Sequence, residues 1–285
     1  MATTYNNLYL DTRARLRKAG IDAAQLEARE LLCYASDKSR EQLYRDMSLY
    51  VSAELERRVE ELVQRRLAGE PVAYIVGEWE FYGLPLDISS DVLIPRSDTE
   101  VLAERAILRA RAAGEGARVL DLCAGSGCVG LAVERSAKNI TALYALEKEE
   151  AAFFYLKENL AAYESRVMPL HQDGLAPGPE ADRLDLILCN PPYLTGEDME
   201  SLQTEVRYEP PSALDGGEDG LDFYRRLTAV WKDRLVSGGL LAYEIGMGQQ
   251  EDVSRILTRE GLEQIHWKED LSGIVRVVAG RKPMQ

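Results

Sequence analysis

Cysteine and histidine are scarce in this chain of 285 residues, which has four of the first and two of the second. The cysteines, Cys33, Cys123, Cys128 and Cys189, form no C-x-x-C pair. Structural zinc sites need clustered cysteine and histidine ligands, and disulfide frameworks are typical of small secreted chains rich in cysteine. We therefore expect no metal and no disulfide.

Long hydrophobic runs are also missing. No stretch approaches the roughly 20 apolar residues that span a bilayer, and the first residues become charged before an apolar signal segment develops. With 46% hydrophobic and 29% charged residues, the composition is typical of a soluble globular protein. We expect a cytoplasmic protein with no membrane partner.

Positive charge is in deficit, since the formal net charge is −14. Residues 1–75 carry as many basic as acidic side chains, so the whole excess of negative charge lies in the later part of the chain. Nucleic-acid binders usually present basic surface to the phosphates, and the sign here is the opposite. The charge argues against a stable nucleic-acid complex and favours a protein partner.

Residues 1–75 have the apolar spacing of helices. In SAELERRVEELVQRRLAGEP, apolar residues recur at helical spacing from Leu55 to Leu67, Ser52 is placed to cap the start, and Gly69 is placed to end the run. This part contains no catalytic constellation. We therefore predict a small helical bundle over residues 1–75 that recognises a substrate.

A connecting region follows at residues 76–96. Aromatic and β-branched residues around Gly83 predict a hairpin linker there. Ser97 stands before Glu100 as in a capping box, which predicts a helix start at that point. We assign residues 97–285 to a catalytic domain.

Strands and helices alternate from residue 118 onward. Apolar strand-like runs such as RVLDLC, TALYALE, RVMPLHQD, LDLILCN and LLAYEIG are separated by amphipathic segments. Such alternation predicts an α/β fold with a parallel sheet covered on both faces by helices. The last two runs, LEQIHWKEDL and IVRVVAG, are joined by a short turn and must therefore pair as an antiparallel hairpin.

The segment DLCAGSGCVG raises the question of a cofactor. Gly125, Gly127 and Gly130 follow a strand in a G-x-G-x-x-G pattern, which taken alone predicts a nicotinamide dinucleotide. However, Asp121 at the strand end would repel the phosphates of a dinucleotide. S-adenosylmethionine has no phosphate and carries a cationic ammonium and sulfonium, so a carboxylate favours it.

Two further acids end the next strands. Glu147 is placed to accept both ribose hydroxyls of a nucleoside, as an acidic residue does in nucleotide-binding folds. Asp173 is placed to accept from the adenine amine, although an aspartate before a glycine also forms turns. Both fall at carboxyl ends of predicted strands, where open α/β sheets bind ligands.

The run LDLILCNPPYL ends on Asn190-Pro191-Pro192-Tyr193. An amide or aromatic amine nitrogen is a poor nucleophile because its lone pair is delocalised. The Asn190 side-chain oxygen and the Pro191 carbonyl can each accept one of its N–H groups and stabilise the positive charge that develops on methylation. The prolines stiffen the turn, and Tyr193 offers a ring for stacking. The plainer alternative is that Pro-Pro ends the strand and Tyr193 packs.

With these blocks on the page, the chain resembles the bacterial release factor glutamine methyltransferases. The resemblance runs from about Glu70 to the end, through EPVAYIVGEWEFYG, VLIPRSDTE, DLCAGSG, NPPY, YEPPSALDGGEDGLDFYRRL, YEIGMGQ and DLSGIVRVVAG. The NPPY block is shared with adenine and guanine amine methyltransferases, whereas YEPPSAL with GGEDGL and the IPR-DTE block are more specific. The N-terminal helices match the family's recognition bundle only in character.

The resemblance implies a class I S-adenosylmethionine-dependent methyltransferase fold: a Rossmann-like seven-stranded sheet with a C-terminal antiparallel hairpin, plus the small N-terminal helical bundle. It implies methyl transfer to the N5 nitrogen of the glutamine in the GGQ motif of class I peptide-chain release factors, with S-adenosyl-L-homocysteine as the product. Residue by residue, it implies cofactor contacts at Asp121, Cys123, Ala124, Gly125, Ser126, Gly127, Glu147, Asp173, Gly174 and Asn190, and a catalytic turn of Asn190, Pro191, Pro192 and Tyr193.

The chain departs from the family pattern at a few positions. Cys123 and Ala124 stand where the family commonly has Gly and Thr, Glu147 replaces the usual Asp, and Ser97 occupies a frequent Pro position. Cys123 adds a side chain where the backbone nears the cofactor, so we expect a lower cofactor affinity.

Three other functions remain open from the sequence. A nucleic-acid adenine or guanine amine methyltransferase would use the same NPPY chemistry, although the acidic catalytic domain argues against it. An NAD-dependent oxidoreductase would use the glycine pattern. A non-catalytic interaction protein would bind the cofactor without turnover.

Overall fold

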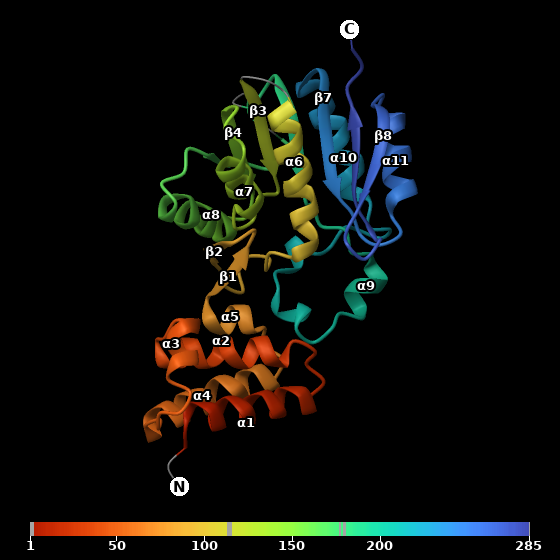
Figure 1. Cartoon of the computed structure of the whole chain (residues 1–285). Helices are drawn as coiled ribbons and strands as arrows, with labels where there is room; N and C mark the ends of the chain where they lie inside the picture. The colour runs from red at the N-terminus through yellow and green to blue at the C-terminus, as the bar shows by residue number, and fades with distance from the viewer. Residues whose placement is uncertain (1–2, 113–115, 177, 179–180, 285) are drawn as a thin grey trace. The chain divides into compact units, whose positions relative to one another are not determined.

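The structure is a computed structural model that describes residues 3–112, 116–176, 178 and 181–284 (Figure 1). The chain divides into two compact units. One is built from the residues up to Glu78 together with Gln203–Tyr208, and the other from Trp79–Leu202 with the residues from Glu209 onward. Within the described part of the chain, no helix is long and apolar enough to cross a membrane.

The first unit is helical. Its helices are α1 (Tyr5–Lys18), α2 (Ala24–Ser36), α3 (Arg40–Arg45), α4 (Ala53–Leu67) and α5 (Val72–Val76). Ser52 caps α4 as predicted, because its hydroxyl accepts from the backbone N–H of Leu55 at 3.1 Å. Apolar side chains from four of the helices, such as Leu16, Leu31, Leu43 and Val63, are fully buried between them.

A buried arginine joins this bundle to a distant stretch of sequence. Arg66 of α4 donates to the carboxylate of Glu27 at 2.6 Å and also pairs with Glu205. Gly69 approaches Thr204 so closely that an added Cβ would lie 2.4 Å from the Thr204 methyl carbon. The segment Gln203–Tyr208 is therefore part of the bundle, although the chain before and after it belongs to the second unit.

The second unit begins with a two-stranded sheet, β1 (Glu78–Phe81) and β2 (Leu84–Asp87). The hairpin predicted around Gly83 is present, and Tyr82 and Gly83 both adopt positive φ at its turn, as a tight turn matched to strand twist requires. The capping box predicted at Ser97 is wrong: Ser97 lies inside a short 3-10 helix, η1 (Ser97–Thr99), with no side-chain cap, and α6 (Glu100–Ala112) follows it directly.

The main sheet has seven strands in the order β5-β4-β3-β6-β7-β9-β8. Their bounds are β3 (Ala117–Leu122), β4 (Ile140–Glu147), β5 (Met168–His171), β6 (Leu184–Cys189), β7 (Leu235–Glu244), β8 (Glu263–Glu269) and β9 (Val275–Arg281). The first five run parallel, and β9 is antiparallel to both β7 and β8. The predicted parallel sheet and terminal hairpin are confirmed.

Helices cover both faces of this sheet (Figure 1). Successive strand residues point to opposite faces, so Val119 and Leu186 join a core with α6, α7 (Cys128–Ser136) and α8 (Glu150–Ala162). Leu120 and Ile187 join a second core with α10 (Asp222–Trp231) and α11 (Gln250–Arg259). Because β3, β4, β5 and β6 run parallel, their carboxyl ends lie at one edge of the sheet. The turns after these strands therefore meet at that edge.

The remaining described elements are short. They are α9 (Gly196–Glu200) and the 3-10 helices η2 (Val206–Tyr208), η3 (Pro211–Ala213) and η4 (Lys232–Arg234).

Candidate functional site

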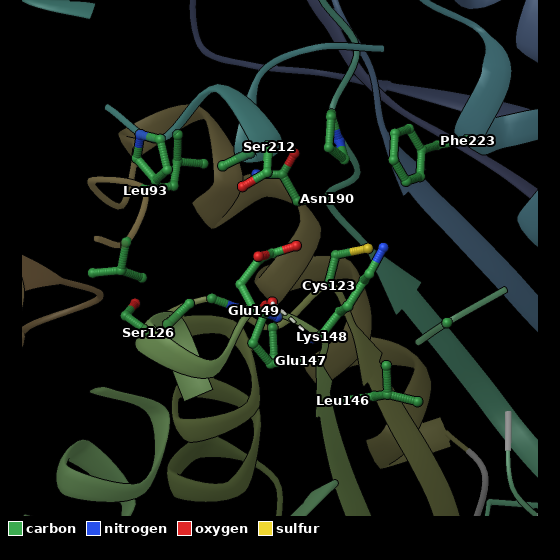
Figure 2. A pocket seen from close by; sticks show the side chains of 18 of the residues that line it. Leu93, Cys123, Ser126, Leu146, Glu147, Lys148, Glu149, Asn190, Ser212 and Phe223 are labelled. Carbon is green, nitrogen blue, oxygen red and sulfur yellow. Dashed lines mark hydrogen bonds between the residues drawn. The ribbon is translucent and has the colours of Figure 1, made fainter. Parts of the chain in front are cut away.

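A cavity of about 460 Å³ opens where the parallel strands end. Figure 2 shows labelled side chains arranged around it, with Asn190 and Ser212 on one side and Glu147 on the other. The sequence-predicted residues that line it are Asp121, Cys123, Ala124, Gly125, Ser126, Glu147, Asp173, Gly174, Asn190 and Pro192. Gly127, Pro191 and Tyr193 are not among its described lining residues.

The turn after β3 is built from left-handed backbone. Cys123, Gly125 and Gly127 have φ of 62°, 54° and 82°. Glycine adopts this region freely, whereas a residue with a Cβ is strained there. Gly127 begins α7, and a Cβ there would lie 2.6 Å from a methyl carbon of Leu156. A side chain at position 127 would therefore crowd Leu156 at the start of α7.

Glu147 closes this turn from the neighbouring strand. Its carboxyl accepts from the backbone N–H groups of Gly125, Lys148 and Glu149, each at 2.8 Å. Burial raises the pKa of Glu147, although the three backbone hydrogen bonds oppose the rise. The carboxyl thus fixes the glycine turn while it lines the cavity.

Asp121, near the end of β3, lines the cavity. One oxygen accepts from the backbone N–H of Gly130 at 2.8 Å. Burial raises the pKa of Asp121 to about 7, the hydrogen bond from Gly130 opposes the rise, and the nearby negative charge of Glu147 adds to it; no cation among the described residues pairs with Asp121. A buried acid in this condition is suited to a positively charged ligand.

The turn after β5 carries Asp173 and Gly174. The Asp173 carboxylate accepts from the N–H of Leu175 at 2.9 Å and lies 3.4 Å from Lys148 Nζ. The hydrogen bond from Leu175 lowers the pKa of Asp173. The Gly174 carbonyl accepts from the indole N–H of Trp231 at 2.8 Å, which ties this turn to α10.

The turn after β6 is held by its surroundings. Asn190 donates from Nδ2 to the hydroxyl of Thr99 at 3.3 Å. The Tyr193 ring packs against the core that contains α10 and α11, and burial raises the pKa of Tyr193 to about 12. The backbone carbonyl of Tyr193 accepts from Gln249 Nε2 at 3.0 Å. The Leu194 N–H donates to the Leu214 carbonyl, and the Leu194 carbonyl accepts from the Gly216 N–H.

Several lining residues were not predicted from the sequence. Glu209 is buried, pairs with Arg96 and accepts from the N–H of Ile94, so it anchors the start of the segment whose Pro210 and Ser212 line the cavity. Phe223 and Arg226 reach the cavity from α10, and Val92 and Leu93 from the connection after β2. The YEPPSAL block, which contains Glu209, Pro210 and Ser212, was the sequence signal that could have located these three residues.

Metal ligation has no support in the part of the chain that the structure describes. No group of three or more His, Cys, Asp or Glu side chains is placed to hold a metal ion there.

The fold and the matching families define the class of protein. Residues 7–77 match the PrmC N-terminal domain, and residues 86–218 match the methyltransferase small domain. A solved methyltransferase from Pyrococcus furiosus superposes with a TM-score of 0.52 at 17% identity, covering 78% of this chain and 98% of that one, which shows a shared fold. The protein has the class I methyltransferase fold expected from the sequence.

Curated relatives define the family. A release factor glutamine methyltransferase from Geobacter sulfurreducens is 40% identical over 95% of this chain and 94% of the relative. One from Thermodesulfovibrio yellowstonii is 37% identical over 90% and 92%. The chain belongs to the release factor glutamine methyltransferase family, and the resemblance drawn from its motifs is confirmed.

Proposed function

We propose that this enzyme transfers a methyl group from S-adenosylmethionine to the side-chain amide nitrogen of the glutamine in the GGQ motif of class I peptide-chain release factors, with S-adenosylhomocysteine as the product. One observation carries the proposal: Asn190, the glycine turn and the two buried acids Asp121 and Glu147 line a single cavity. Family membership supports the glutamine acceptor over a nucleic-acid amine and over hydride transfer.

The cavity fits the cofactor chemically. S-adenosylmethionine supplies an electrophilic methyl group on a positively charged sulfur. We assign Asp121 and the turn from Cys123 to Gly127 to its charged methionine end, because the buried Asp121 carboxyl has no described cationic partner. We assign Glu147 to the ribose hydroxyls, and Asp173 with Gly174 to the adenine.

The turn after β6 would act on the acceptor. Asn190 Oδ1 and the Pro191 carbonyl would accept the two N–H groups of the glutamine amide, which holds its nitrogen in place and stabilises charge that grows during transfer. Pro192 stiffens the turn and lines the cavity. Stacking of the acceptor on Tyr193 stays a prediction, since the ring packs against the core.

The N-terminal helical unit would recognise the release factor. It matches the PrmC N-terminal domain and lines none of the described cavity. The sequence boundaries of residues 1–75 for recognition, 76–96 for the linker and 97–285 for catalysis belong to this proposal, as does the cytoplasmic location.

The test uses methyl-labelled S-adenosylmethionine with three acceptors in parallel: a class I release factor, duplex DNA and a structured RNA. The proposal predicts label in the release factor alone. Label in nucleic acid alone would assign the enzyme to the amine methyltransferases of nucleic acids. A thermal shift with NADH but none with S-adenosylmethionine would favour the oxidoreductase, and cofactor binding without label in any acceptor would favour a non-catalytic protein.

A further inference from the structure

Asn159 is a buried polar side chain that the proposed reaction does not use. It lies in α8 and is 1% exposed. Asparagine is a weaker helix former than alanine or leucine, and a buried amide is costly unless it is hydrogen bonded. The same helix faces the core with apolar side chains such as Leu156 and Leu160. An apolar residue would therefore serve at position 159 if packing were its only task.

The Asn159 amide joins two segments that are far apart in sequence. Its Oδ1 accepts from the backbone N–H of Asp87 at 2.8 Å, and its Nδ2 donates to the Asp87 carbonyl at 3.0 Å. Nδ2 also donates to the carbonyl of Ser126 at 3.0 Å. All three partners are backbone groups, whose roles as donor or acceptor are fixed. The orientation of the amide is therefore fixed as well.

Both segments continue into the lining of the cavity. Ser126 belongs to the glycine turn after β3 and lines the cavity itself. Asp87 ends β2, and the connection that follows it contributes Asp91, Val92, Leu93, Pro95 and Arg96 to the lining. The turn and the connection lie against each other, because a Cβ added at Gly125 would lie 3.7 Å from a methyl carbon of Val92. Asn159 therefore ties the strand end that leads into one wall of the cavity to the turn that forms the other.

We propose that Asn159 is a positioning residue for S-adenosylmethionine: it holds the connection of residues 88–96 against the glycine turn and so keeps this part of the cavity preformed. The proposal rests on the cofactor assigned in the proposed function. Asn159 is not among the described lining residues, so it acts through Asp87 and Ser126. A preformed site binds more tightly because the ligand does not have to order its walls.

Tyr163 shows what a tie between α8 and the hairpin alone would need. It is the C-cap residue of α8, and its hydroxyl donates to the Pro85 carbonyl of β2 at 2.6 Å. This bond already attaches the helix to the strand. Asn159 adds the bond to the Ser126 carbonyl, which reaches the glycine turn. That additional bond is what a purely structural link to the hairpin does not require.

The first experiment measures S-adenosylmethionine binding by isothermal titration in Asn159→Leu, which keeps the approximate shape of the side chain and removes its hydrogen bonds. We expect Kd to rise about tenfold, the effect of a group left without its hydrogen bond. In release factor methylation, KM for the cofactor should rise with Kd, while kcat at saturating cofactor stays close to the wild type. An unchanged Kd would overturn the proposal.

Two matched variants separate positioning from a general loss of stability. Tyr163→Phe removes the bond to β2 and leaves the bond from Asn159 to Ser126 in place. Leu160→Ala removes a core side chain, 5% exposed, from the position next to Asn159. Both should lower Tm without raising Kd for S-adenosylmethionine. If Leu160→Ala raised Kd as much as Asn159→Leu at a similar loss in Tm, any weakening of α8 would loosen the cavity, and the positioning role would be wrong.

A second readout needs neither cofactor nor turnover. Hydrogen–deuterium exchange of peptides from residues 88–96, followed by mass spectrometry, reports how firmly the connection is held. Exchange there should be faster in Asn159→Leu than in the wild type and unchanged in Tyr163→Phe. Unchanged exchange in Asn159→Leu would contradict the proposal.

Should Asn159→Leu fail to fold, Asn159→Asp replaces it. An ionised aspartate keeps an oxygen that accepts from the Asp87 N–H but cannot donate to the Ser126 carbonyl. The same rise in Kd and the same faster exchange are expected. Wild-type affinity in Asn159→Asp would overturn the proposal, because the bond to Ser126 would then be irrelevant to the cofactor.

The same series separates this inference from the proposed function. If the wild type does not bind S-adenosylmethionine, the proposed function fails and the inference fails with it. If the wild type binds the cofactor and methylates a release factor, while Asn159→Leu binds the cofactor equally well, the proposed function stands and the positioning role is wrong.

Discussion

A Cβ atom added at Gly216 would lie 2.7 Å from the Cα of Tyr193. The backbone of the GGEDG stretch therefore runs directly against the turn that carries Asn190. The Gly216 N–H donates to the Leu194 carbonyl at 2.8 Å and locks this approach. Because both partners are backbone, neither can move aside for a side chain.

Gly216→Ala should consequently displace the turn after β6. We expect a loss of more than about tenfold in kcat/KM, since small displacements of positioning groups are costly, together with a lower Tm. Gly196→Ala, at the first residue of α9, is the control, because nothing lies within 4 Å of its added Cβ. The steric account fails if both variants retain wild-type kinetics.

Cys123 carries a side chain in left-handed backbone, at φ 62°. That region costs a residue with a Cβ about 1–2 kcal/mol relative to glycine. Cys123→Gly should therefore be more stable than Cys123→Ala by about 1 kcal/mol in urea unfolding, and should bind S-adenosylmethionine at least as tightly as the wild type. A less stable glycine variant would show that the αL backbone is not strained.

The pKa of Asp121 determines a pH dependence of stability. Burial raises this pKa to about 7 from a usual 3.8. As pH rises between these values the unfolded chain loses the proton first, so the contribution of Asp121 to stability, full at low pH, is lost by about pH 7. The loss is on the order of 4 kcal/mol.

Asp121→Asn removes this titration and keeps an oxygen that can accept from the Gly130 N–H. The free energy of unfolding of the variant, relative to the wild type in the absence of cofactor, should therefore increase as pH goes from 4 to about 8. A difference that stays constant across this range would mean that Asp121 titrates near its usual pKa in the folded protein.

Trp231 holds the turn after β5 through its bond to the Gly174 carbonyl. Trp231→Phe keeps most of the ring but leaves that carbonyl without this donor, which should cost about 1–3 kcal/mol and weaken S-adenosylmethionine binding. The control is Trp267→Phe, because Trp267 is 44% exposed and its N–H donates to Ser254 instead. Isothermal titration of both variants measures the effect, and equal affinities would contradict a role for the Trp231 bond.

Asn190→Ala is expected to lower turnover roughly 10²–10³-fold, as for loss of one hydrogen-bond partner of the transition state. Its cofactor affinity and Tm should stay close to the wild type, since the Asn190 side chain makes one long hydrogen bond, to Thr99, in the described structure. An unchanged rate would remove Asn190 from the mechanism.

The sequence predicted the sheet and its terminal hairpin because strand and helix periodicities are local patterns. It also placed Asp121, Glu147 and Asp173 at one edge, since the carboxyl ends of parallel strands must meet there. The approach of α10, which brings Phe223 and Arg226 to the cavity, was not predictable because α10 reads as an ordinary amphipathic helix and its rotation depends on tertiary packing.

Three other features lay beyond local patterns. Ser97 fits a capping box by spacing, but the chain forms a 3-10 turn there and begins α6 later. The Asn190–Thr99 hydrogen bond joins residues far apart in sequence, and no periodicity reports such a pair. Glu205 is similar, because only the fold shows that it pairs with Arg66 in the helical unit.

Tandem mass spectrometry of a class I release factor, after incubation with the enzyme and isotopically labelled S-adenosylmethionine, tests the central claim most directly. The account predicts one labelled methyl group on the side-chain nitrogen of the GGQ glutamine, and loss of most of that label with Asn190→Ala. A methyl group on any other atom, or an unmodified glutamine after incubation with active wild-type enzyme, would contradict it.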